Sequence, residues 1–178
     1  MTDDDAMDPA AIEEATQALA ARVFDAARNG DSEAMTAFLD QGLPANFRND
    51  KGDSLLMLAS YHGHVALTEL LLTRGADPEL VNDRGQTPLA GAAFKGEAEI
   101  ARLLLDHGAK VDGAGPDGRT PLMMAAMFNR TELVDCLLER GADIAARTPE
   151  GTTARDAAAV MGAADAIALL DARLAGSA

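Results

Sequence analysis

Two kinds of apolar run alternate along this chain, and polar segments that contain glycine separate them. In the clearest stretch, a short run of small residues at 90–93 precedes a longer one in which Ile100 and Leu104 recur at helical spacing. The polar segment before them, 82–85, reads Asn-Asp-Arg-Gly, a composition that favours tight turns. The pattern therefore predicts a unit made of a turn, a short helix, a second turn and a longer helix.

The ends of both predicted helices are marked by residue type. The hydroxyl of Thr87 can accept a hydrogen bond from an unpaired N–H group of the first turn, and Pro88 suits the first helical position. Gly96 breaks the short helix, and Gly108 is placed to close the longer one as a C-terminal cap. The small residues of the short helix allow it to pack closely against its neighbours.

The same unit recurs with a fixed step of 33 residues, as three phased series of turn residues show. A period between about 20 and 50 residues is typical of solenoids and propellers. Because one unit cannot bury its apolar face alone, we expect stacked units to share one continuous core. The series are Gly52, Gly85, Gly118 and Gly151; Gly30, Gly63, Gly96, Asn129 and Gly162; and Gly42, Gly75, Gly108 and Gly141.

The repeated residues resemble the ankyrin repeat. Residues 85–89 and 118–122 read Gly-Gln-Thr-Pro-Leu and Gly-Arg-Thr-Pro-Leu, and the long helices end in a shared Leu-Leu-x-x-Gly-Ala pattern. The resemblance covers roughly residues 16–175 and is closest to small bacterial ankyrin repeat proteins. It implies an all-α solenoid of about five stacked helix-turn-helix repeats with short hairpin-like turns, capped at both ends. The units are expected at about 16–48, 49–81, 82–114, 115–147 and 148–175.

The chain departs from the family pattern inside the array. The histidine that usually follows Thr-Pro-Leu is replaced by Met57, Ala90 and Met123, so the hydrogen bonds it supplies between repeats should be missing or replaced. The second unit begins its short helix at Ser54 without a proline. Asn129 stands where the other units have glycine, a substitution that still tolerates the left-handed conformation.

The two ends of the array are expected to be caps. A helix start at Asp8 and Pro9 precedes the first unit, and the last unit carries Arg155 and Asp171 where internal units carry leucine. A polar outer face on a terminal unit keeps an open-ended stack soluble. We expect a disordered acidic N-terminus over 1–8, an array over 9–175, a disordered tail over 176–178, and a complete protein rather than a fragment.

Composition narrows the classes of partner and compartment. Hydrophobic residues make up 48% of the chain but aromatic residues only 3%, so alanine and leucine should build the core of one array rather than two domains. A net charge of −14 argues against nucleic acids and anionic membranes, which are polyanions. No secretory signal or membrane-spanning run is present, and a single cysteine excludes an intramolecular disulfide. These features predict a cytoplasmic protein.

The sequence predicts no catalytic centre, cofactor or metal site. Cys136 takes a slot that leucine fills in other units, which favours a core position over a nucleophile. His64 follows a turn glycine, where ankyrin repeats commonly carry histidine, and His107 precedes a capping glycine, where a cation suits the helix dipole. His62 and His64 lack a third ligand for zinc, and the Asp-rich turns supply too few oxygens for calcium. We therefore interpret the chain as a non-enzyme.

The positions of the aromatic residues point to a partner-binding surface. The resemblance implies that the last residues of each short helix and the turn fingertips line a concave face, and three of the six aromatic residues fall there. Exposed apolar stripes with a polar rim mark interaction sites. The alternative is that these side chains fold back and seal the junctions between repeats. The predicted partner-binding residues are Tyr61, His62, Arg84, Phe94, Lys95, Arg119, Met127, Phe128, Val160 and Met161.

These observations predict a binding module that holds one protein partner of unknown identity as an adaptor, an inhibitor or an assembly factor. The chain is expected to be a monomer. The alternatives are a self-associating scaffold protein, for instance a homodimer, and an accessory factor to a stress-response enzyme. The last follows only from the resemblance, because some small bacterial ankyrin proteins are associated with oxidative-stress enzymes.

Overall fold

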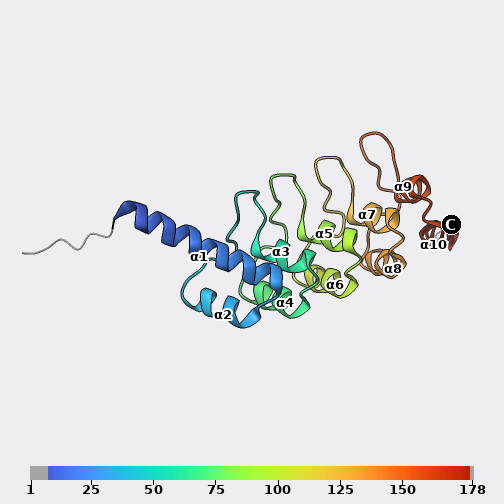
Figure 1. Ribbon diagram of the computed structural model, residues 1–178. Coiled ribbons are helices and arrows are strands. Elements are labelled where there is room, and N and C mark those ends of the chain that lie inside the picture. Colours follow the sequence, from blue (N-terminus) through green and yellow to red (C-terminus); the bar gives the residue numbers. More distant parts are fainter. Residues whose placement is uncertain (1–7, 177–178) are drawn as a thin grey trace, which may run out of the picture.

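The computed structural model describes residues 8–176, which form ten α-helices and no β-strand beyond one isolated bridge between Arg48 and Ser54 (Figure 1). The predicted all-α solenoid is confirmed. The disorder predicted for residues 1–7 and 177–178 lies outside the described residues. The helices are α1 (Pro9–Asn29), α2 (Ser32–Asp40), α3 (Leu55–Tyr61), α4 (Val65–Thr73), α5 (Pro88–Lys95), α6 (Ala98–Asp106), α7 (Pro121–Met127), α8 (Thr131–Glu139), α9 (Ala154–Met161) and α10 (Ala164–Gly176).

The helices lie in two layers, and a row of loops projects from one side of them (Figure 1). The inner helices α3, α5, α7 and α9 pack in sequence against one another, and α4, α6, α8 and α10 form the outer layer behind them. A continuous core of alanine, leucine and methionine side chains fills the space between the layers. The inner helices and the projecting loops, which we call the hairpins, therefore share one side of the molecule.

The capping residues predicted for one unit are confirmed. The hydroxyl of Thr87 accepts a hydrogen bond from the backbone N–H of Ala90 at 3.1 Å, and α5 ends at Gly96 with φ of +86°. In the unit that lacks a proline, Ser54 caps α3 in the same way by accepting from the N–H of Met57 at 3.1 Å. Short local signals thus determine where each inner helix begins and ends.

The hairpins supply part of the hydrogen bonding between neighbouring units. Met57 and Met123, which replace the family histidine, are buried and leave the inner helices without its polar side chain. In three successive hairpins a side-chain oxygen instead accepts a hydrogen bond from a backbone N–H 31 residues further along the chain, at 2.8–3.1 Å. The acceptor and donor pairs are Asn46 with Asp77, Glu79 with Lys110, and Asp112 with Asp143.

The first helix differs from every other inner helix in length. α1 has 21 residues and extends past the stack, whereas the later inner helices have seven or eight (Figure 1). Asp8, which was expected in the disordered segment, caps α1 by accepting a hydrogen bond from the N–H of Ala10 at 3.1 Å. At the other end Gly176, expected in the tail, is the last residue of α10.

The polar residues of the last unit form a pair on the end of the stack. Arg155 on α9 donates from Nε and Nη2 to the two carboxylate oxygens of Asp171 on α10. This bidentate contact holds the pKa of the Asp171 carboxyl below its ordinary value. Internal units place buried or partly buried leucines at both positions, for example Leu122 and Leu138. An ion pair takes their place where no further repeat covers the surface.

Replacing Thr68 with valine is expected to raise the free energy of unfolding by about 1 kcal/mol. Thr68 on α4 is fully buried, and its hydroxyl oxygen is the one side-chain polar atom of residues 8–176 that is buried without a hydrogen-bond partner. Valine keeps the shape and removes the unsatisfied group. Urea denaturation measures the change. The control is Thr120→Val, which removes a hydroxyl that caps α7 and should cost about 1 kcal/mol; a loss of stability in both variants would contradict the prediction.

Candidate functional site

Three aromatic side chains from consecutive units touch one another on the side of the inner helices. Tyr61 ends α3, Phe94 lies in the last turn of α5, and Phe128 follows α7. The Tyr61 and Phe94 rings are stacked with centroids 6.3 Å apart, and the Phe94 and Phe128 rings meet edge to face at 4.7 Å. Both distances fall in the range of favourable aromatic contacts. We call these three residues the aromatic ladder.

The apolar residues predicted for the stripe are exposed to different extents. Val160 and Met161 of α9 are 83% and 52% exposed, and Tyr61 and Phe94 are 39% and 36% exposed. Met127 and Phe128 are half-buried. Phe128 thus behaves in part as the alternative interpretation expected, since it packs into the junction beside Phe94. Tyr61, Phe94, Val160 and Met161 remain exposed and available to a partner.

A groove of about 580 Å³ lies beside the ladder, between the inner helices and the hairpins. Five of the predicted residues line it, which are Tyr61, His62, Arg84, Phe94 and Arg119. A smaller hollow of about 390 Å³ continues toward the C-terminal units, where Arg119, Met127 and Val160 contribute to its wall. The structure therefore gathers seven of the ten predicted residues around two adjoining hollows. The remaining three, Lys95, Phe128 and Met161, line neither of them.

The groove exists because one unit carries small side chains where its neighbours carry large ones. Its floor includes Ala90 and Gly91 of α5, while the equivalent positions of α3 are Met57 and Leu58. A Cβ atom added at Gly91 would lie 3.6 Å from the Tyr61 ring, so a side chain there would point into open space beside the ladder. Sequence reasoning missed this floor. The signal that could have found it is the sudden drop in side-chain size at one repeat position.

The polar groups around the groove differ in how far their charges are compensated. Oδ1 of Asp53 accepts a hydrogen bond from the side-chain amide of Asn82 at 2.9 Å. Oδ2 of Asp117 lies 3.6 Å from Nε of Arg119. Arg84 forms no ion pair with any residue in the described range 8–176. Lys95 places its Nζ 5.1 Å from the centre of the Tyr61 ring, which is cation–π geometry.

The pKa of His62 is lowered from its ordinary value, first by burial and then by the positive charges around it. Those charges belong to His64, Lys95 and Arg28. The neutral imidazole is therefore favoured at this edge of the groove, and its surroundings are electropositive.

Comparison with known proteins identifies the repeats. The family model for three copies of the ankyrin repeat matches residues 23–114, and that for a single ankyrin repeat matches 117–149. This chain belongs to the ankyrin repeat family. A protein of Pseudomonas aeruginosa that is named as an ankyrin repeat protein is 56% identical over 55 residues, which are 31% of this chain and 32% of that protein. The match thus spans about a third of the relative's length.

The ankyrin repeats that match the family carry most of the site. Eight of the predicted binding residues lie within the matched segments, and Val160 and Met161 lie beyond them.

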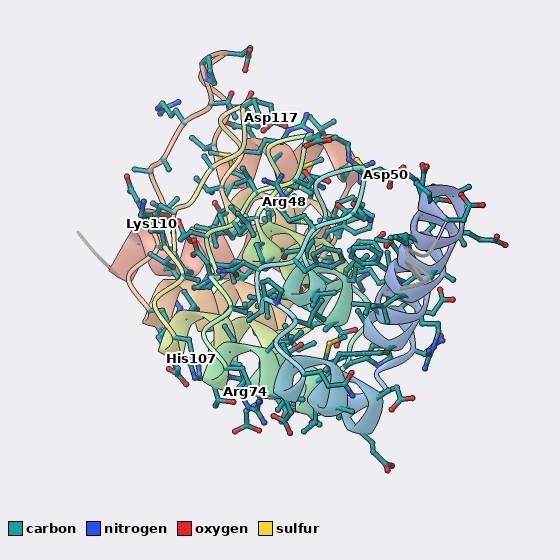
Figure 2. The ribbon with its side chains drawn as sticks, turned by 90° about the vertical axis from the view of Figure 1, so that its left-hand side faces the viewer. Arg48, Asp50, Arg74, His107, Lys110 and Asp117 are labelled. Atoms are coloured by element: carbon teal, nitrogen blue, oxygen red, sulfur yellow. The ribbon has the colours of Figure 1, made fainter. Side chains whose placement is uncertain are left out.

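Over residues 8–176 no helix has the length and apolar character needed to cross a bilayer, and no three His, Cys, Asp or Glu side chains come together as metal ligands. Figure 2 shows Asp50 and Asp117 toward the hairpin side and Arg74 and His107 on the outer-helix side of the array.

Residues considered for other chemistry have structural contacts in this ankyrin array. Cys136 is 4% exposed and belongs to the core, as its repeat position predicted. The Nε2 atom of His64 lies 2.7 Å from the carbonyl oxygen of Arg28 in the preceding unit, so this nitrogen is the donor. His107 caps α6 and donates from Nδ1 to the carbonyl oxygen of Leu103 at 2.9 Å. Each of these groups stabilises the stack.

Proposed function

We propose that this ankyrin repeat protein is a non-enzymatic binding module that holds a protein partner in the groove beside the aromatic ladder. Such a module acts as an adaptor, an inhibitor or an assembly factor. The observation that carries the proposal is the hollow over Ala90 and Gly91, flanked by the exposed rings of Tyr61 and Phe94. Aromatic, methionine and arginine side chains are the residues enriched in the centres of protein interfaces.

A macromolecular partner fits this surface better than a small molecule. The groove and the adjoining hollow extend over several units, from α3 to α9, and both are lined by hairpin residues as well as by helix residues. The net charge of −14 disfavours nucleic acids and anionic bilayers as partners. We therefore propose a protein as the occupant of this surface. A cytoplasmic location and a monomeric state belong to the same proposal.

Replacing Gly91 with methionine tests the proposal without weakening the fold. The new side chain occupies the hollow, and Met124 stands at the equivalent position one unit further on. The change also removes a glycine from a helix interior, which should add about 1 kcal/mol of stability. Affinity capture from a lysate of the source cells, read by mass spectrometry, compares this variant with the wild type. We expect a partner retained by the wild type to fall at least about tenfold with Gly91→Met, while the melting temperature does not fall.

The matched control is Gly176→Met, which adds the same side chain at the exposed end of α10, where no atom lies within 4 Å. It should retain the partner fully. Val160→Asp gives a second test, because its site is 83% exposed and the change does not disturb the core. Partners captured equally by wild type, Gly91→Met and Val160→Asp would place the interface on another face and overturn the proposal.

Self-association is the second candidate, and α1 provides the observation that favours it. Ile12 and Leu19 are 47% and 48% exposed and lie on the same helix face as Val23, which is buried in the core. Light scattering over a concentration series decides this: a wild-type dimer that Leu19→Glu converts to a monomer supports it, and a wild-type monomer throughout removes it.

A further inference from the structure

Half of the cations that form no ion pair with residues 8–176 lie in or near the groove. All fifteen lysines and arginines lie in the described part of the chain, and nine of them form ion pairs. Of the other six, Arg84 lines the groove, Lys95 lies over the Tyr61 ring at its edge, and Lys51 occupies the tip of the adjoining hairpin. The remaining three, which lie elsewhere on the array, are Arg22, Arg130 and Arg147.

The carboxylates in and beside the groove contact groups other than Arg84 and Lys95. Asp53 is held by the side-chain amides of Asn82 and Asn49, and Asp117 by Arg119. Asp83, next to Arg84, pairs instead with Arg48 of the preceding hairpin. Asp53 keeps its charge because the amides are neutral, so the charges that line the groove sum to zero. Lys95 at the edge leaves a small positive excess, in a chain whose net charge is −14.

Distance decides which of these charges a ligand in the groove experiences. The Debye length is about 8 Å at physiological ionic strength, so carboxylates on the far side of the array are largely screened. Charges that line the groove, which are Arg84, Arg119, Asp53 and Asp117, lie within that range of anything bound there. The electropositive surroundings of His62, formed by His64, Lys95 and Arg28, point in the same direction.

Between these cations the groove is apolar. The floor at Ala90 and Gly91 is flanked by the side chains of Met57, Leu58 and Met124, with the Phe94 ring along one side. A hollow of this kind accepts one large apolar side chain, whose burial contributes about 1.5–3 kcal/mol. Arg84 in the lining and Lys95 at the edge thus lie close to an apolar floor.

We propose that the part of the partner that enters the groove is an extended acidic segment with one large apolar side chain. The apolar side chain lies over Ala90 and Gly91 against Phe94, and flanking carboxylates pair with Arg84 and Lys95. This inference rests on the proposed function, since it specifies the chemistry of the partner for the same groove.

A library of random dodecapeptides displayed on phage tests this inference with a defined probe. Peptides selected on the wild type are sequenced, and their excess of Asp and Glu over Lys and Arg is compared with that of the unselected library. A parallel selection uses the double variant Arg84→Glu, Lys95→Glu, in which both sites are exposed and free of ion pairs, so the fold is retained. The control is Arg147→Glu, the same charge reversal at one cation that lines neither hollow, which carries half of the double variant's charge change.

We expect wild-type and Arg147→Glu selections to yield acidic peptides with a recurrent Leu, Ile, Met or aromatic residue. The acidic excess should disappear on the double variant, and a synthetic wild-type peptide should bind it at least about tenfold more weakly by calorimetry. Peptides without an acidic excess, or with equal affinity for the double variant, overturn the inference. If peptides without an acidic excess fail to bind Gly91→Met, the proposed function stands and only this inference is overturned. Acidic peptides that bind Gly91→Met with wild-type affinity occupy another site, which overturns the inference. Recovery of no peptide also overturns the inference.

Discussion

Replacing Gly85 with asparagine is expected to lower the free energy of unfolding by about 2–4 kcal/mol, whereas Gly151→Asn should cost less than about 1 kcal/mol. The two glycines occupy the same position of their hairpins, 66 residues or two repeats apart, and both have positive φ, +71° and +87°. Asparagine tolerates this conformation at little cost. The backbone requirement alone would therefore make the two substitutions equally mild.

The difference between the two sites comes from the neighbouring unit. A Cβ atom at Gly85 would lie 2.4 Å from both Cγ and Cδ of Pro116 in the next hairpin, and a proline ring cannot rotate away. At Gly151, in the last hairpin, nothing lies within 4 Å of that position. Asparagine at Gly85 must consequently push the hairpins apart, which costs about 1–3 kcal/mol for steric strain alone and more where hydrogen bonds are lost.

Urea denaturation followed by circular dichroism measures both changes, with Gly85→Ala and Gly151→Ala as a second pair. Alanine adds the strain of a left-handed conformation, about 1–2 kcal/mol, at both sites, and the difference between sites should persist. Equal losses at Gly85 and Gly151 would show that only the local turn requires glycine. Unequal losses show that the 33-residue glycine series also records how closely successive units approach.

Local features of the fold could be predicted because they depend on residues close in sequence. Thr87 and Gly96 mark the ends of α5 through bonds within one turn, so their roles follow from residue type and spacing. The contact of Tyr61 with Phe94 follows from the repeat step once the stack is assumed. The bidentate contact between Arg155 and Asp171 did not follow in this way. Each residue was recognised as polar, but their pairing depends on how α9 packs against α10.

The groove itself could not be predicted because its floor is formed by absent side chains. The small residues at 90 and 91 indicated close packing between helices, which is how small residues usually act. In the structure Gly91 instead faces the space beside Tyr61, with Leu58 and Met124 at the equivalent positions of the neighbouring units. Whether a small residue brings two helices together or leaves a hollow depends on the crossing geometry, which one sequence does not contain.

Replacing Leu104 with alanine is expected to lower the free energy of unfolding by about 3–5 kcal/mol and to abolish partner binding. Leu104 belongs to a series with the same 33-residue step, Leu71, Leu104, Leu137 and Leu170, whose members are all fully buried. It lies on α6, in the middle of the array, with a unit packed on either side. A cavity there weakens the contacts of α6 with both neighbours and with α5, which carries Phe94.

The matched control is Leu170→Ala on α10, the same substitution in the last unit. In a stack where each unit contacts only its neighbours, a terminal defect can be relieved by fraying of the last unit, and the rest of the array keeps its structure. Global stability should then fall by about 1–3 kcal/mol, hydrogen exchange should quicken mainly in α9 and α10, and binding to the groove should survive. Leu104→Ala should instead accelerate exchange in α5, α6 and α7 together. If Leu170→Ala abolished binding as completely as Leu104→Ala, the array would unfold as a single unit. The distance of the groove, over α3, α5 and α7, from the C-terminal unit would then not protect binding from a defect in that unit.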